Sequence, residues 1–295
     1  AFVGRIDFTP AGDFSESALS RGVRASQAQC DTVPNGLWAA TPSHGSECIK
    51  YWAAGLGPGP HKRVLVYFHG DIWVGAGKTS KAYLESSNDK LQADADAWGK
   101  RLGVPYVFIG RPGTHGSSGD HMQRRRPHES LQISAALDQL KRKFQVDEFV
   151  VAGQSGGGHV TASLLALRND IVCAVPTSAP SSPRVRWQTH GWRGDPTGYA
   201  DSYEPVEHLT KQSMHPALRV FVLGDPTDRN VLWPSQTILS DKLRELGVPV
   251  SVLQGQGTGP DAHGLSTSGR LVAGWCFKDT TTPAIEERAA QGLKG

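Results

Sequence analysis

The sequence predicts an α/β protein, with a mostly parallel central sheet and helices on both faces of that sheet. From residue 63 onward, short apolar runs alternate with longer segments that fit helices. The runs are continuously apolar instead of alternating with polar residues, which is typical of parallel strands covered on both faces. No run approaches the ~18 consecutive apolar residues of a membrane helix, so we expect no membrane span.

The predicted strands occupy residues 47–53, 63–68, 104–109, 148–152, 171–176, 218–223 and 248–253. The predicted helices occupy residues 81–102, 128–144, 156–168, 234–246 and 264–277. We expect residues 1–60 to form an N-terminal extension packed on the sheet, 61–277 the main domain, and 278–295 a loosely held C-terminal tail. Residues 177–217 are an insertion that we expect to cover the carboxyl ends of the strands, where such sheets bind ligands.

The most informative motif is Gly153-Gln154-Ser155-Gly156-Gly157, which follows a predicted strand and directly precedes a predicted helix. Strand, tight turn and helix in this order are the context of a nucleophile elbow, whose strained turn exposes a serine hydroxyl. Strand and helix approach closely there, so the residues two before and two after the serine must be small. We therefore interpret Ser155 as a nucleophile. The alternative is a glycine-rich turn that closes a βα unit or binds a phosphate.

A serine nucleophile needs a base and a carboxylate that orients the base, and after an elbow these follow in the order acid, then histidine. The predicted strand 218–223 is followed by Asp225 and Asp228. We favour Asp228 as the acid, because Asp225 lies at the strand end and is better placed to brace the turn; the alternative is that both only cap the loop. His263 follows the last predicted strand on a glycine-flanked loop and is the predicted base.

An oxyanion formed by attack of the serine needs two N–H donors. One predicted donor is Gly156, directly after the nucleophile. The other is the backbone N–H of Asp71, with Gly70 as the alternative, because His69-Gly70-Asp71 directly follows the predicted strand 63–68. We expect the His69 ring to support this loop.

These features resemble the α/β-hydrolases, and within that superfamily they are similar to the catalytic domains of the prolyl oligopeptidase and dienelactone hydrolase groups. The resemblance covers about residues 60–277 and rests on His69-Gly70, residues 111–119, the elbow, residues 199–209, Asp228 and His263. It implies the α/β-hydrolase fold, with 61–277 as the catalytic domain, and a serine hydrolase that works through a Ser-His-Asp triad and an acyl-enzyme, without a cofactor. The implied substrate is a small-molecule carboxylic ester. The alternatives are cleavage of short peptides or amides, and a hydrolase fold used only for binding.

Two departures from that pattern favour an ester over a peptide as the substrate. The residues before the elbow are too few for the β-propeller of full-size oligopeptidases. No proline directly follows Val231 in the acid turn, where the nearest one is Pro234.

The insertion contains Trp187, Trp192 and Tyr199, which are candidates for substrate binding. The alternative is that these aromatic side chains pack the insertion onto the body of the domain. His115, His121 and His128 fit no common zinc spacing, so we expect no metal.

The charge of the chain limits the classes of binding partner. The formal net charge is +3, and the basic cluster Arg124-Arg125-Arg126 has no interleaved aromatics, so we expect no nucleic-acid partner. We interpret this cluster as a solvated loop, with a patch that attracts anionic substrate as the alternative.

Cys30 and Cys48 are close enough in sequence to form a disulfide. Cys173 lies in an apolar run, so we expect it to be a buried free thiol, and the position of Cys276 indicates no role. The chain starts at Ala1 without a methionine, and together with one plausible disulfide this favours a secreted or periplasmic protein; a cytoplasmic one is the alternative. The oligomeric state is left open.

Overall fold

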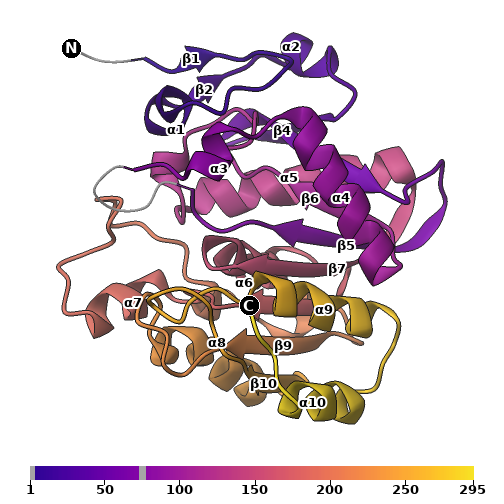
Figure 1. Cartoon of the computed structure of the whole chain (residues 1–295), viewed down its shortest axis with the longest axis vertical. Helices are drawn as coiled ribbons and strands as arrows, with labels where there is room; N and C mark the ends of the chain where they lie inside the picture. Colours follow the sequence, from indigo (N-terminus) through magenta and orange to yellow (C-terminus); the bar gives the residue numbers. More distant parts are fainter. Residues whose placement is uncertain (1–3, 73–77) are drawn as a thin grey trace.

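The computed structural model describes residues 4–72 and 78–295, and its centre is an eight-stranded sheet in the order β10-β9-β8-β7-β5-β6-β4-β3 (Figure 1). All strand pairs from β5 to β10 are parallel, whereas β4 runs antiparallel to β3 and β6. The strands are β3 (Gly36–Thr41), β4 (Gly45–Ala54), β5 (His61–Phe68), β6 (Tyr106–Ile109), β7 (Val146–Gln154), β8 (Ile171–Thr177), β9 (Arg219–Gly224) and β10 (Val250–Gln254). The predicted fold class is confirmed, and every predicted strand is present.

Helices cover both faces of the sheet (Figure 1). One face packs against α5 (Pro127–Phe144), α6 (Gly156–Leu167) and α8 (Trp233–Glu245). The other packs against α4 (Asn88–Leu102), α9 (Ser266–Phe277) and α10 (Thr282–Ala290).

Strand β7 shows why the apolar runs are continuous. Phe149 and Val151 belong to the core on one face, while Val150 and Ala152 belong to the core on the other. Successive side chains of a strand point to opposite faces, so a strand buried on both faces has no polar positions.

The N-terminal residues form a small layer at the β3–β4 end of the sheet (Figure 1). It contains β1 (Ile6–Asp7), α1 (Glu16–Arg21), β2 (Val23–Arg24) and α2 (Gln27–Asp31). A disulfide between Cys30 and Cys48 joins α2 to β4, at the pair that the sequence spacing suggested.

Three expectations are wrong. The predicted helix 81–102 is divided into α3 (Lys81–Leu84) and α4, because the Ser87 side chain accepts from the N–H of Lys90 and caps a new helix there. Cys173 is not a free thiol but forms a disulfide with Cys276, which joins β8 to α9. The tail 278–295 is not loose: it folds into α10, whose Ile285 side chain is fully buried against the sheet.

Short elements connect the strands near the carboxyl edge of the sheet. Between β8 and β9 lie α7 (Pro183–Thr189) and two 3₁₀ turns, η2 (Pro205–Glu207) and η3 (Lys211–Ser213). A third 3₁₀ turn, η1 (His121–Gln123), precedes α5. Within residues 4–72 and 78–295, no helix has the length and apolar character needed to cross a membrane.

Candidate active site

Ser155 lies in the turn between β7 and α6, with φ 55° and ψ −117°. Residues other than glycine rarely adopt a positive φ, so this turn is strained as an elbow requires. A side chain on Gly153 would place its Cβ 2.1 Å from the carbonyl oxygen of Gly157, and one on Gly157 would lie 2.1 Å from that of Phe68. Both glycines are therefore required by the close approach of strand and helix.

His263 connects Ser155 to Asp228. Its Nε2 lies 2.8 Å from the Ser155 hydroxyl oxygen, and its Nδ1 lies 2.7 Å from Oδ2 of Asp228. The Asp228 carboxylate is fully buried, while 18% of the imidazole is exposed. Such an arrangement can move a proton from a serine hydroxyl to a histidine whose tautomer is fixed by a carboxylate.

The two candidate acids have different partners. Oδ1 of Asp228 accepts from the N–H groups of Asn230 (2.8 Å) and Val231 (2.9 Å), which leaves Oδ2 for His263. Asp225 instead accepts from the N–H groups of Thr227 (2.8 Å) and Gly257 (2.9 Å). Asp225 therefore braces the loops, and Asp228 is the carboxylate that contacts the histidine.

Gln154 fixes the histidine loop and was missed by the sequence analysis. Its Nε2 donates to the His263 carbonyl oxygen (2.9 Å), and its Oε1 accepts from the N–H of Leu265 (3.2 Å). The Ser178 hydroxyl donates to the same His263 carbonyl (2.7 Å). The only signal for Gln154 was its position directly before Ser155.

The segments that carry the predicted N–H donors lie next to Ser155. Gly156 is the first residue of α6, whose first-turn N–H groups have no acceptor within the helix. A Cβ on Gly70 would lie 3.6 Å from the Cβ of Ser155, so the loop after β5 passes next to the serine. The next residue, Asp71, extends its carboxylate across Gly156, where a Cβ would be 2.0 Å from Oδ1.

His69 supports this loop, as the sequence suggested. Its Nε2 accepts from the N–H of Arg111 (3.0 Å), so the proton is on Nδ1, which donates to the Gly70 carbonyl (2.6 Å). Burial, with His115 and Arg111 nearby, keeps the pKa of His69 well below its usual value. The ring is therefore a neutral structural group.

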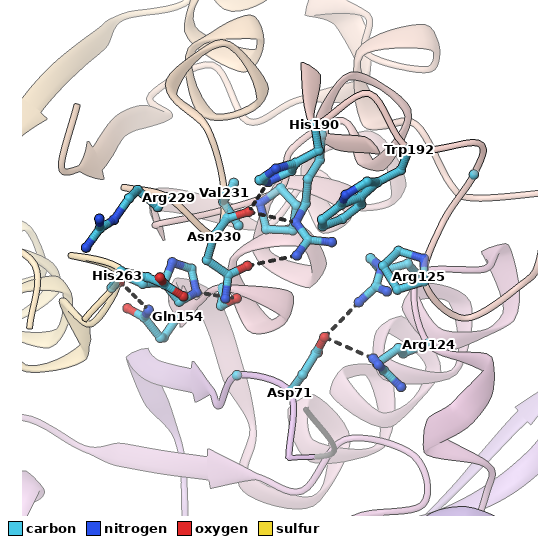
Figure 2. Close-up of a pocket in the computed structure, with 17 residues that line it drawn as sticks. Asp71, Arg124, Arg125, Gln154, His190, Trp192, Arg229, Asn230, Val231 and His263 are labelled. Atoms are coloured by element: carbon cyan, nitrogen blue, oxygen red, sulfur yellow. Dashed lines mark hydrogen bonds and ion pairs between the residues drawn. The ribbon is translucent and has the colours of Figure 1, made fainter. Parts of the chain in front are cut away.

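A pocket of about 860 Å³ opens above Ser155 and His263 (Figure 2). Its lining also includes Arg186, His190 and Trp192 from the segment between β8 and β9. The His190 and Trp192 rings stack with their centroids 4.1 Å apart. In Figure 2, His263 lies on one side of the pocket and Trp192 on the other.

Comparisons with known proteins identify the fold. Neither a protein-family model nor a curated protein matches the chain. Among solved structures, Est1E from Butyrivibrio proteoclasticus with bound ferulic acid aligns with a TM-score of 0.55 and 14% identity, over 84% of this chain and 99% of that one. An esterase from Pyrococcus furiosus gives a TM-score of 0.53 and 15% identity, over 82% and 90% of the two chains.

An acylaminoacyl peptidase in complex with Z-Gly-Gly-Phe-chloromethyl ketone gives a TM-score of 0.55 and 16% identity, over 84% of this chain but only 41% of the peptidase. The chain has the α/β-hydrolase fold. The resemblance seen in the sequence is thereby confirmed at the level of the fold. In this sheet, Ser155 follows β7, Asp228 follows β9 and His263 follows β10, so the three residues meet at the carboxyl ends of parallel strands.

Of the three aromatic residues proposed for substrate binding, only Trp192 lines the pocket of this hydrolase fold. Trp187 lies next to Arg186 on α7 but is not among the residues that line the pocket. Tyr199 is 37% exposed and packs under the Arg126 guanidinium, 4.2 Å from its ring centroid. The expectation is therefore corrected for Trp187 and Tyr199.

The basic cluster 124–126 is not a solvated loop. Arg124 and Arg125 are 7% and 4% exposed, and both pair with Oδ2 of Asp71, at 2.9 and 2.7 Å; only Arg126 pairs at the surface, with Asp201. Burial opposes ionisation of Asp71, but these arginines and Arg111 outweigh it and hold the pKa of Asp71 well below its usual value. The pocket therefore borders a buried network of ion pairs.

Among the described residues, no group of three or more histidines, cysteines or acidic residues is arranged to hold a metal. His121 accepts from the N–H of Ile72 (3.1 Å) through Nε2, and burial lowers the pKa of His121 well below its usual value. Burial also lowers the pKa of His115 to about 3. These rings are neutral packing groups.

Proposed function

We propose that the protein is a serine hydrolase that cleaves carboxylic esters. The observation that carries this proposal is the continuous chain of hydrogen bonds from Asp228 through His263 to Ser155, at a positive-φ turn between strand and helix. Both bonds are of ordinary hydrogen-bond length, so His263 can accept the Ser155 proton directly while Asp228 orients the imidazole. Ser155 lines the pocket, where a substrate can reach it.

In the proposed reaction, the Ser155 hydroxyl oxygen attacks the ester carbonyl while Nε2 of His263 accepts its proton. Asp228 stabilises the imidazolium that forms. The N–H groups of Gly156 and Asp71, with Gly70 as the alternative to Asp71, stabilise the oxyanion. The intermediate then expels the alcohol, which takes the proton from His263, and leaves an acyl group on Ser155. Water, deprotonated by His263, releases the acid and restores the serine.

The size of the pocket and the extent of the structural matches favour an ester. A volume of about 860 Å³ accommodates a small organic molecule. The two esterases are matched over 99% and 90% of their lengths, and one of them is described with ferulic acid bound. The acylaminoacyl peptidase supports a second candidate, cleavage of short peptides, but most of that protein has no counterpart in this chain.

A fluorophosphonate probe and a substrate pair test the proposal. We expect the probe to label the wild type and not Ser155→Ala, and p-nitrophenyl butyrate to be hydrolysed far faster than a peptidyl p-nitroanilide. Labelling that persists in Ser155→Ala would contradict the role of Ser155, and no labelling at all would favour a binding protein. Faster cleavage of the anilide would move the assignment to the peptidases.

We also propose that the protein works in an oxidising compartment, as a secreted or periplasmic enzyme. All four cysteines are paired, as Cys30–Cys48 and Cys173–Cys276. Such pairs do not persist in a reducing cytosol. Alkylation of the unreduced protein, taken directly from its source cells, should modify no cysteine. Modification of all four would support the cytoplasm instead.

A further inference from the structure

Arg186 is a pocket-lining cation that contacts only neutral groups. Its Nη2 donates to Oδ1 of Asn230 (2.8 Å), its Nε donates to the Asn230 carbonyl (3.3 Å), and its guanidinium lies over the Trp192 ring, 5.0 Å from the centroid. Within residues 4–72 and 78–295, no carboxylate lies within 4.0 Å of it and its other N–H groups have no partner. Arg186 is therefore held in place without being neutralised.

The charges behind Arg186 cancel one another. The neighbouring network consists of three arginines and three carboxylates: Arg111, Arg124, Arg125, Asp71, Glu129 and Asp195. Asp71 pairs with all three arginines, Glu129 with Arg111, and Asp195 with Arg125. These six charges sum to zero, so Arg186 leaves one positive charge in excess.

The rest of the pocket does not supply the missing anion. Asp71 already lies among three guanidinium groups, and Asp261 is exposed at the rim. The environment opposes the charge on Arg186, because burial and then Arg125 lower its pKa. An arginine keeps its proton in proteins, so this cost is relieved only when an anion binds.

We propose that Arg186 binds a carboxylate of the substrate, so that the preferred esters carry an anionic group besides the scissile bond. This inference rests on the proposed ester hydrolysis at Ser155. A guanidinium fork pairs well with a carboxylate, and a cation in a partly desolvated pocket favours a charged partner. His190 and Trp192 line the same pocket and give the uncharged part of the substrate aromatic side chains to pack against.

Two pairs of esters test the preference, because the carboxylate could belong to either side of the scissile bond. The first pair is mono-p-nitrophenyl adipate and its methyl ester, with the charge on the acyl part. The second is 4-(butyryloxy)benzoate and its methyl ester, with the charge on the leaving group. In at least one pair, we expect kcat/KM to be about 10- to 100-fold higher for the charged member, as for a charge-assisted hydrogen bond.

Variants of α7 assign that preference to one side chain. In Arg186→Gln, the ratio within the pair should fall to about one, whereas Arg186→Lys should keep part of it because the charge remains. The matched control is Arg184→Gln, on the same helix, where Arg184 is half exposed and pairs with Glu207 outside the pocket. We expect this control to keep the wild-type ratio.

Binding measured without catalysis separates this inference from the proposed function. Titration calorimetry of the wild type with dicarboxylates from succinate to suberate should show binding at millimolar concentration, while the matching diamides should not bind. Arg186→Gln should lose that binding. Ratios near one in both ester pairs, or equal binding of acids and amides, would overturn the inference. If the probe does not label Ser155 but dicarboxylates still bind, the proposed hydrolase function would be wrong while the anion site at Arg186 would stand.

Discussion

The pocket has two walls that are built differently. One wall, the catalytic wall, carries Ser155 and His263, with the buried Asp228 behind His263; these residues follow β7, β10 and β9 and are joined by two hydrogen bonds. A second wall, the arginine wall, carries Arg186 and Trp192 on the segment between β8 and β9, together with Arg125 of the buried ion pairs. The parallel sheet fixes the first wall, whereas the second depends on contacts between connecting segments.

We expect the first wall to carry out the proposed reaction and the second to decide which substrates bind. The strand ends place the three residues of the proposed triad wherever the sheet forms. The arginine wall is positioned by α7. Arg186 and His190, one helical turn apart, both form hydrogen bonds to Asn230, which joins this helix to the loop that carries Asp228. Changes to the first wall should therefore affect every substrate, and changes to the second should affect the choice of substrate or stability.

The largest expected effect is at Ser155. Replacing it with alanine should lower kcat for p-nitrophenyl butyrate about a millionfold, because the proposed acyl-enzyme forms on its hydroxyl. The control is Ser163→Ala on α6, whose hydroxyl donates to the His159 carbonyl (2.8 Å) inside the core. Comparable loss in both variants would show that the effect is structural.

The next effect distinguishes the two aspartates. Asp228→Asn should lower kcat about ten-thousandfold, because an amide no longer fixes the tautomer of His263 or stabilises its charge. In Asp225→Asn, the single amide oxygen can replace only one of the two carboxylate oxygens that accept from Thr227 and Gly257, but neither bond involves His263, so kcat should fall less than about tenfold. Steady-state kinetics of the two variants would contradict the assignment if the order were reversed.

Most of the catalytic wall could be predicted from the sequence, because strand ends are local features. Ser155, Asp228 and His263 each directly follow or lie near an apolar run, and the order of elements places them together. Even there, Gln154 was missed, since its bond to His263 joins residues 109 positions apart.

The arginine wall could not be predicted in the same way. The pair of Arg125 with Asp195 spans 70 positions, and that of Arg186 with Asn230 spans 44. In the sequence, Arg124-Arg125-Arg126 is a basic cluster like any on a surface loop, and only the packed structure buries two of its members. The disulfide of Cys173 was missed for a similar reason, because Cys276 lies 103 positions away.

The Cys173–Cys276 disulfide should stabilise the fold more than the Cys30–Cys48 disulfide does. It anchors β8, whose end bonds to Ser155 through the Thr177 carbonyl (2.8 Å). Loop-closure entropy predicts a loss of about 4–5 kcal/mol in the free energy of unfolding for Cys173→Ala, against about 3 kcal/mol for Cys30→Ala with its 18-residue separation. Urea denaturation measures both. A larger loss for Cys30→Ala would indicate that local packing dominates.

The smallest expected effect is a pH-dependent change in the free energy of unfolding, caused by the ion pair of Arg125 with Asp195. Burial opposes ionisation of Asp195, but Arg125 and Thr197 outweigh it and lower the pKa of Asp195 to about 2. A lowered pKa stabilises the fold above the unfolded-state value near 4, and this stabilisation disappears as the pH falls through 2. Asp195→Asn should therefore be about 2 kcal/mol less stable than wild type at pH 6, with the gap closing towards pH 2. A gap independent of pH would contradict the ionic role.

The most direct test of the central claim, that Ser155 is a nucleophile activated by His263 and Asp228, is to locate a fluorophosphonate adduct by peptide mass spectrometry. We expect a single adduct on Ser155 in the wild type, and labelling slowed by at least about a thousandfold in His263→Ala. An adduct on another residue, or labelling of His263→Ala at the wild-type rate, would contradict the claim.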